Sequence, residues 1–255
     1  MRGQRASQLA VVALVMATAC SSGSRPDAAP GPGAAEVTVD LAAQRQRMGG
    51  FGVSARVFSD PHLAGSPTVD VPPAAREEIL RWLFGDLRLT RMRSVLDPGL
   101  EATNDNRDPS VLETNRLDYA GKRSDDHAAL ARDATRFGLR TFFAAPVTTE
   151  PWMDDGDVDE YVEWAMAQLE RWRAFGAEPA FYSPLNERSA RGERGQEWYV
   201  AVVKTLGRRM RAAGLATRLV VSDDLNPKRT YPTAAAVLAD PEARGYVGAL
   251  AYHLY

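Results

Sequence analysis

The sequence predicts an α/β fold, and more closely a (β/α)8 TIM barrel of which about six βα units are present. Three observations support this prediction. An amphipathic helix, a glycine and an apolar run follow one another in a pattern that recurs beyond residue 48. The apolar runs suit strands that are buried on both faces, as in a parallel sheet. The length of 255 residues is also that of one barrel domain.

The N-terminus, residues 1–20, is predicted to be an export signal. Arg2 and Arg5 precede an apolar stretch at 9–16, which is too short to span a bilayer. The small residues that follow lead to Cys20, the single cysteine, and resemble the bacterial lipobox, whose cysteine receives a lipid. We therefore expect a cell-surface lipoprotein held by Cys20 at the outer face of the cell membrane. Secretion after ordinary signal cleavage is the alternative.

A flexible linker is expected at 21–36, because its Ser, Gly, Pro and Ala residues cannot bury enough apolar surface to fold. Beyond it the apolar runs predict six strands. The last five each follow a glycine suited to the left-handed conformation that ends a helix. The strands are expected at 51–57, 87–93, 139–145, 179–183, 219–222 and 247–252, and the glycines are Gly85, Gly138, Gly176, Gly214 and Gly245.

Two of the intervening helices are defined by apolar residues at helical spacing: Ile79, Leu80, Leu83 and Phe84 in one, and Tyr161, Trp164, Ala165, Leu169 and Trp172 in the other, with Asp155 or Asp157 as its cap. A doubly wound sheet is the alternative to a barrel. A nucleotide-binding sheet of that kind has a glycine-rich turn after its first strand, whereas Gly49–Gly52 lies before or within it. This favours the barrel. Six strands leave a barrel two βα units short, so we expect a truncated barrel.

The charge and cysteine content exclude several functional classes. The 31 basic and 33 acidic residues give a net charge of −2, which provides no long-range attraction for nucleic acid or an acidic membrane surface. A single cysteine excludes a disulfide within the chain and a multi-thiolate metal site. Asp223 and Asp224 are adjacent on a predicted strand, so their side chains should point to opposite faces. We predict no metal and no cofactor, and the sequence does not indicate an oligomeric state.

The candidate active site follows the fourth predicted strand. In an α/β barrel the active site is built at the carboxyl ends of the strands. There the sequence places Asn186 and Glu187 side by side. Glycoside cleavage requires a carboxylic acid that protonates the departing oxygen, and an adjacent amide can hold the sugar hydroxyl next to the reacting carbon. The pair therefore predicts a carbohydrate substrate.

Several segments resemble glycoside hydrolase family 30, a family of clan A. Ser183–Glu187 resembles the Asn-Glu signature at the end of the clan's fourth strand. The other matching segments follow the family's order over about residues 37–255: Val37–Asp40 with Gln46–Gly52, Leu89–Arg93, Ala144–Pro146 with Pro151–Met153, and Tyr252–Tyr255. The resemblance implies that 37–47 is a strand of a side β-sandwich and that 48–255 is a partial TIM-barrel catalytic domain.

The resemblance further implies a retaining O-glycosyl hydrolase that acts on a β-linked glycan or glycoside by double displacement. Glu187 would be its general acid/base, assisted by Asn186. In the family the nucleophile follows the seventh strand, which lies outside these 255 residues, so this chain by itself is expected to be inactive. Contacts with the carbohydrate are expected from Arg91, Trp152, His253, Tyr255 and Asp97.

Two arginines and one departure from the family bear on the details of the site. At most one of Arg91 and Arg93 is expected to face the barrel mouth. Motif position favours Arg91, where it would keep the nucleophile ionised, and Arg93 is the alternative. Arg188 stands where the family commonly has proline, a difference expected to affect the substrate.

Structural roles remain as alternatives for the other residues. Trp152 suits the core as well as sugar stacking, and His253 and Tyr255 suit a packed core. Asp97 also suits a turn, and Glu187 a solvated loop. For the whole protein, the alternatives are a non-catalytic glycan-binding lipoprotein on a degenerate glycosidase barrel and a clan A glycosidase of another family.

Overall fold

The computed structural model describes residues 42–43, 48–54, 71–96, 100–101, 103–104, 108, 117–119, 123–155, 158–188 and 195–254. Contacts divide the chain into two units, Met1–Arg47 and Met48–Tyr255, and the fold below is that of the second. The predicted signal with Cys20, the linker and nearly all of the 37–47 strand lie outside the described residues, as do Asp97 and Tyr255. None of the described helices combines the length and apolar character needed to cross a membrane.

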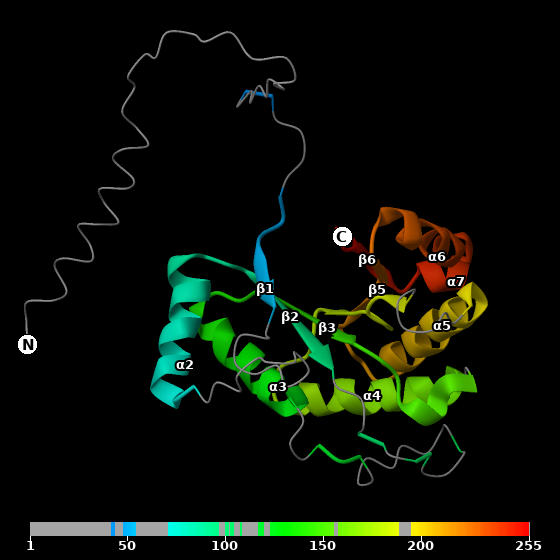
Figure 1. Ribbon diagram of the computed structural model, residues 1–255, viewed down its shortest axis with the longest axis horizontal. Helices are drawn as coiled ribbons and strands as arrows, with labels where there is room; N and C mark the ends of the chain where they lie inside the picture. Colours follow the sequence, from blue (N-terminus) through cyan, green and yellow to red (C-terminus); the bar gives the residue numbers. More distant parts are fainter. Residues whose placement is uncertain are drawn as a thin grey trace, which may run out of the picture. The chain divides into compact units, whose positions relative to one another are not determined.

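The unit is built on a parallel sheet whose six strands are hydrogen-bonded in chain order, β1 to β6 (Figure 1). Parallel neighbours in chain order require a helical crossover between each pair, which is the βα repeat of a barrel. The predicted α/β class and partial TIM barrel are thereby confirmed. The strands are β1 (Gly52–Ser54), β2 (Arg91–Leu96), β3 (Thr141–Pro146), β4 (Phe181–Tyr182), β5 (Arg218–Asp224) and β6 (Val247–Tyr252).

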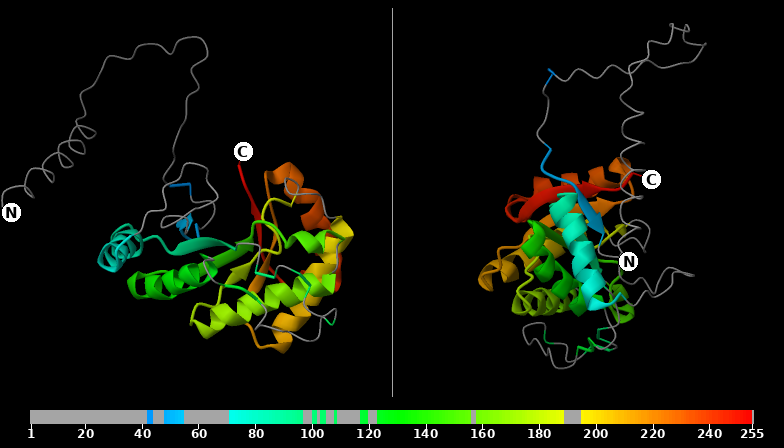
Figure 2. Two further views of the ribbon diagram at one scale, coloured as in Figure 1. Left: turned by 60° about the horizontal axis from the view of Figure 1, so that its bottom comes forward. Right: turned by 90° about the vertical axis from the view of Figure 1, so that its left-hand side faces the viewer.

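Helices cover the outer side of the curved sheet (Figure 2). The two predicted apolar faces are used as expected, since Leu80 and Phe84 are buried in the first and all five named residues are buried in the second. The helical segments are α2 (Pro73–Leu80), the π-helix η2 (Arg81–Asp86), α3 (Arg123–Ala134), η4 (Thr135–Phe137), η5 (Pro151–Asp155), α4 (Val158–Ala174), α5 (Gln196–Ala212), α6 (Pro227–Ala239) and α7 (Pro241–Arg244).

The core between sheet and helices centres on α4. Trp172 is 1% exposed, its ring stacks on Phe142 of β3 at 4.9 Å between centroids, and its indole nitrogen donates to the Ser124 hydroxyl at 2.7 Å. Buried aromatic side chains contribute the largest apolar areas, and a paired indole N–H removes the cost of burying it. This contact fixes α4 against β3, the strand next to the one that carries the candidate site.

Two of the five glycines do not adopt the predicted left-handed conformation, although Gly245 does follow the end of α7. Gly85 lies inside η2, and Gly245 has a right-handed φ of −61°. After η2 the left-handed residue is Arg88, with φ of 55°, so β2 begins at Arg91 rather than at Leu87. The other three glycines are left-handed as predicted, with φ of 119° at Gly138, 74° at Gly176 and 67° at Gly214.

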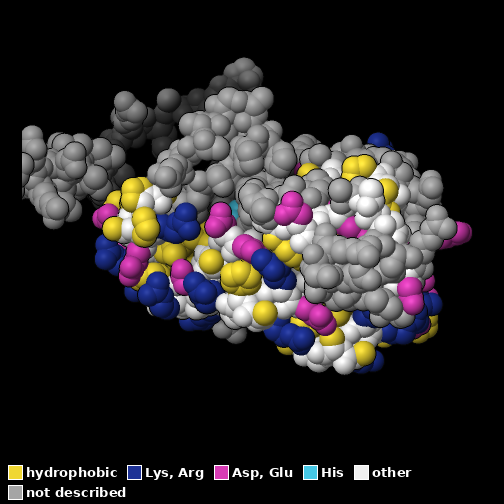
Figure 3. Space-filling model, turned by 90° about the horizontal axis from the view of Figure 1, so that it is seen from below, with side chains coloured by type: hydrophobic (Ala, Val, Ile, Leu, Met, Phe, Trp, Pro, Cys, Tyr) yellow, Lys and Arg dark blue, Asp and Glu magenta, His cyan; other side chains and the backbone are white. Residues whose placement is uncertain are grey.

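The inner face of the sheet encloses a cavity of about 620 Å³. Residues from all six strands line it, among them Arg91, Arg93, Phe143 and Phe181. Met92, between the two arginines, is 2% exposed within the hydrophobic core. On the outer surface, the face in Figure 3 carries Lys and Arg side chains interspersed with Asp and Glu, so charges of one sign do not gather there.

Candidate active site

The segment after β4 is fastened to the strands on both sides of it by its backbone. The amide of Ser183 donates to the carbonyl of Ala144 at 2.9 Å, and that of Asn186 to Pro146 at 2.9 Å, both on β3. The amide of Glu187 donates in the other direction, to the carbonyl of Asp223 on β5 at 2.8 Å. The position of Glu187 is therefore set by the sheet rather than by a free loop.

Glu187 and Asp223 both adopt a left-handed backbone, with φ of 52° each. This conformation costs a non-glycine residue on the order of 1 to 2 kcal/mol and persists only where the surroundings enforce it. The hydrogen bond between their backbones links the two strained residues directly. Strain of this kind gathers at functional sites, which makes this pair a candidate on backbone grounds alone.

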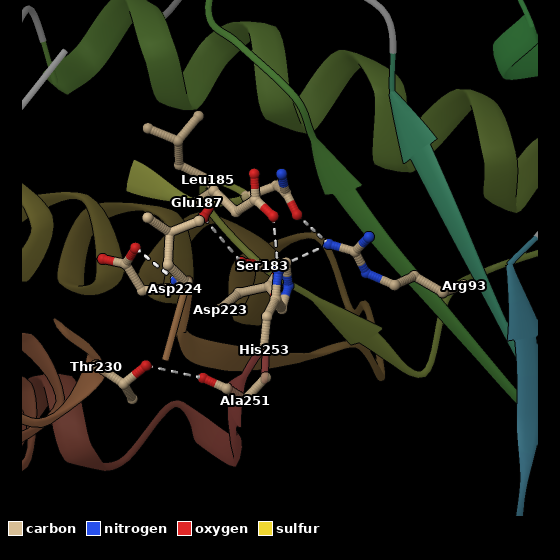
Figure 4. A network of polar contacts seen from close by, with 11 residues as sticks. Arg93, Ser183, Leu185, Glu187, Asp223, Asp224, Thr230, Ala251 and His253 are labelled. Carbon is tan, nitrogen blue, oxygen red and sulfur yellow. Dashed lines mark hydrogen bonds and ion pairs between the residues drawn. The ribbon is translucent and has the colours of Figure 1, made fainter. Parts of the chain in front are cut away.

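Five polar side chains meet at this point, and we call them the Glu187 cluster: Arg93, Asn186, Glu187, Asp223 and His253 (Figure 4). His253 Nδ1 lies 2.7 Å from Glu187 Oε1, and its Nε2 lies 3.2 Å from Asp223 Oδ1. Arg93 Nη2 donates to Asp223 Oδ2 at 2.9 Å and also to Asn186 Oδ1. The cluster thus joins Arg93 within β2 to the carboxyl end of β5 and to the segments that follow β4 and β6.

The electrostatics of the Glu187 cluster favour an ionised Asp223 and a protonated His253. Burial by itself would raise the pKa of Asp223, but the hydrogen bond from His253 and the charge of Arg93 outweigh it and hold this pKa below its usual value. The hydrogen bond to Asp223 raises the pKa of His253, against the opposing effects of burial and of Arg93. Charges that are only 2–17% exposed at Asp223, Glu187 and His253 interact more strongly than they would in water.

The structure brings three of the predicted residues together, Asn186, Glu187 and His253. Of the two arginines, Arg93, the alternative, reaches the cluster and Arg91 does not, and a contact of Arg91 with a carbohydrate stays a prediction. The expectation that the two would point to opposite faces was wrong, because residues two apart on a strand share a face. They differ in position along β2: Arg91 pairs with Thr141 at the start of β3, and Arg93 pairs with Phe143, two residues further along both strands.

Trp152 lies in η5 after β3, partly buried against the hydrophobic core. Its indole nitrogen donates to the carbonyl of Glu101 at 2.8 Å. That contact fixes the ring in the loop region at the carboxyl end of β3, and its role towards a sugar stays a prediction. Asp97 and Tyr255 lie outside the described residues.

Arg188 and Asp223 were interpreted incompletely from the sequence. Arg188 is 8% exposed and donates through Nη2 to the Thr233 hydroxyl of α6 at 2.9 Å, so its side chain contacts a helix, and its effect on the substrate stays a prediction. Asp223 was considered only as a metal ligand. Its place at the end of β5 was the signal that could have identified it, because that is where barrel active sites are built. Among the residues described, no three His, Cys, Asp or Glu side chains are arranged to share a metal ion.

No protein-family model and no curated protein matches the sequence, but solved structures match the fold. An endo-β-1,6-glucanase superposes with a TM-score of 0.64 at 20% identity, over 86% of this chain and 54% of its own. Family 30 xylanases from Clostridium acetobutylicum and Clostridium papyrosolvens superpose with TM-scores of 0.55 and 0.59 at 16% and 17% identity, each over 84% of this chain and 52% of their own. The chain therefore spans about half the length of these structures. The unit that carries the Glu187 cluster has a fold like that of glycoside hydrolase family 30.

Proposed function

We propose that the protein is a retaining glycoside hydrolase that cleaves O-glycosidic bonds of a β-linked glycan or glycoside, with Glu187 as general acid/base. One observation carries the proposal. Glu187 stands at the carboxyl end of the fourth parallel strand, beside Asn186, in a fold shared with glycosidases. The carboxyl ends of the strands are where enzymes of this architecture bind and transform substrate.

In the proposed reaction, Glu187 protonates the oxygen of the departing sugar and later removes a proton from the attacking water. Asn186 holds a sugar hydroxyl beside the reacting carbon. A retaining enzyme needs a second carboxylate about 5 to 5.5 Å from the first as nucleophile. Asp223, the other carboxylate of the Glu187 cluster, is held by Arg93 and His253. As the family resemblance implies, we propose that the nucleophile follows a seventh strand, outside these 255 residues, and we expect no hydrolysis from this chain alone.

The carbohydrate is proposed as the main partner, and the cell membrane as the second. Attachment through a lipid on Cys20 would place the barrel outside the cell, where polymeric glycans are available. Secretion without a lipid remains the alternative form of export. Neither form requires a nucleic acid or a cofactor.

A non-catalytic glycan-binding protein is the second candidate. It is favoured by the same engagement of Asp223, which leaves the Glu187 cluster with one carboxylate for chemistry. The two candidates differ in what the natural full-length protein does with an aryl β-glycoside or a β-glycan. The glycosidase releases product, whereas the binding protein retains the polymer without shortening it.

The test compares three forms of the natural full-length protein: wild type, Glu187→Gln and Glu178→Gln. Loss of the acid/base is expected to lower kcat/KM on β-glycans by about 10²- to 10⁴-fold. Glu178 is a matched control, since it precedes β4, accepts a hydrogen bond from the Thr217 amide at 3.1 Å, and leaves an acceptor oxygen as Gln. Equal hydrolysis by wild type and Glu187→Gln would remove Glu187 from the reaction. No hydrolysis by any form, with polymer retained, would favour the binding protein.

A further inference from the structure

The imidazole of His253 lies between two carboxylates, an arrangement that restricts where protons can be. Nδ1 faces Glu187 Oε1 at 2.7 Å and Nε2 faces Asp223 Oδ1 at 3.2 Å (Figure 4). An ionised carboxylate only accepts hydrogen bonds, and a neutral imidazole carries a single N–H. Two acceptors cannot both be satisfied by one N–H. Because Arg93 donates to Asp223 and keeps that carboxylate ionised, a further proton must reside on the ring or on Glu187.

Two proton arrangements satisfy both contacts. In the first, His253 is an imidazolium that donates to Glu187 and to Asp223. In the second, Glu187 is protonated and donates to Nδ1, while Nε2–H still donates to Asp223. Both contain the same number of protons, and both keep Nε2–H on Asp223. If the shared proton is lost, the Nδ1 lone pair faces a carboxylate oxygen at 2.7 Å, which is repulsive.

We infer that Glu187 and His253 bind one proton jointly, and that Asp223 is the positioning residue that keeps Nδ1 of His253 turned towards Glu187. The sharing of the proton is inferred from the geometry of the three side chains, and its role in catalysis rests on the proposed function. His253 and Asp223 act through Glu187 and are not themselves catalytic residues.

Asp223 is placed to hold both the ring and the backbone of the acid. Its carboxylate accepts hydrogen bonds from Nε2 of His253 and Nη2 of Arg93, and its carbonyl accepts one from the amide of Glu187 at 2.8 Å. The main chain of His253 is fixed as well, since its amide donates to the carbonyl of Asp224 at 2.8 Å. With Asp223 only 2% exposed, water competes little for these contacts.

The charged groups that face His253 come from three strands. Glu187 after β4 and Asp223 on β5 favour the imidazolium, and Arg93 on β2 opposes it. The carboxylate of Asp224, next to Asp223, points away from the ring in Figure 4. From α6 the hydroxyl of Thr230 contacts the neighbouring carbonyl of Ala251 and carries no charge. The raised pKa of His253 agrees with this balance of two anions against one cation.

The shared proton supplies the proposed reaction with its acid. In the first half, the nucleophile's carboxylate bonds to the sugar carbon as the bond to the leaving oxygen breaks, and that oxygen takes the proton whose bond to Glu187 breaks. That leaves the Glu187 carboxylate facing a neutral ring, the repulsive arrangement. In the second half, the oxygen of the attacking water bonds to the sugar carbon as the bond to the nucleophile breaks, and the water gives a proton back to the pair. The sum is hydrolysis, with the pair returned to its starting state.

The experiment is a titration of the imidazole nitrogens of the 15N-histidine-labelled full chain by NMR. The chain has three histidines, and a His253→Gln sample identifies the signal of interest. In wild type, His253 is expected to stay protonated above the ordinary imidazole pKa of about 6.5. Asp223→Asn and Glu187→Gln each remove one facing anion, and each is expected to lower the midpoint by about 1 to 3 pH units. Glu178→Gln, at the opposite end of β4, is expected to leave it unchanged.

A wild-type midpoint at the ordinary value, or no shift in both variants, would overturn the inference. If Asp223→Asn fails to fold, Glu187→Gln alone decides, because it leaves Asp223 and its contacts in place. In the natural full-length protein, Asp223→Asn is also expected to move the alkaline limb of the kcat/KM profile to lower pH. The titration needs no hydrolysis. A shifted His253 together with an inactive natural full-length protein would support the shared proton and contradict the proposed function. An active natural full-length protein with an unshifted His253 would do the reverse.

Discussion

Replacing Arg93 by methionine should lower the free energy of unfolding by about 2 to 4 kcal/mol, because it leaves Asp223 buried without its cationic partner. The guanidinium lies 2.9 Å from the carboxylate. At an effective dielectric constant of about 20, two unit charges at this separation attract one another by about 6 kcal/mol. Arg93 is 27% exposed, so water screens part of this attraction, and His253 still holds the other oxygen of Asp223. The net loss is therefore smaller than the full attraction.

Arg91→Met is the matched control for this prediction. Arg91 lies on the same strand and the same face, two residues earlier, and is exposed. We expect it to change the free energy of unfolding by less than about 0.5 kcal/mol. Urea unfolding of the full chain at pH 7, followed by circular dichroism, measures both variants. Equal losses in the two variants would refute the assignment of Arg93 to the cluster, and so would a loss below about 0.5 kcal/mol in Arg93→Met.

Three further predictions concern other parts of the chain. The pKa of His253 is raised on folding, so its contribution to stability is complete below about pH 6.5 and is lost as the pH rises through the folded-state pKa. His253→Gln should therefore lower the free energy of unfolding most in acid and least in alkali. A loss of stability that grows with pH would contradict this. Gly207→Ala should lower the free energy of unfolding by about 1 to 3 kcal/mol, because the added Cβ would clash with the ring of Tyr246. In Gly85→Ala the added Cβ would lie 3.7 Å from its nearest neighbour, so this variant should be neutral or stabilising. Chemical unfolding compares the two variants. Cys20→Ser should abolish labelling by a radioactive fatty acid and release the protein from the membrane fraction; unchanged labelling would exclude lipidation at Cys20.

The fold was predictable from the sequence because its signals are local. Helical spacing of apolar residues around Trp164 and Trp172, glycines at 138, 176 and 214, and apolar runs between them locate the repeating units without knowledge of distant contacts. The boundary at β2 was missed for a local reason of another kind. Arg88 adopts a left-handed backbone, which arginine does not favour and which its residue type therefore does not predict.

The candidate site was predictable only in part, because its contacts are tertiary. The strand-end rule located Asn186 and Glu187. Choosing between Arg91 and Arg93 required the height of β2 relative to β4, which follows from the pairing of Arg93 with Phe143 and of Phe143 with Phe181. Two-residue periodicity specifies a face of a strand but not a height. The role of Asp223 depends on a buried ion pair that no spacing in the sequence indicates.

The backbone hydrogen bonds that fasten the segment after β4 have a consequence for how this protein can vary. Ser183, Asn186 and Glu187 are tied to β3 and β5 through main-chain atoms, which every amino acid except proline can provide. Side chains in the loops after other strands can then be exchanged without turning Glu187 away from its partners. The loops after other strands can therefore determine which sugar is preferred, while the segment after β4 separately positions the acid. Chimaeras that import whole loops from related barrels should keep the acid in register, and such exchanges offer a practical route to new substrate ranges.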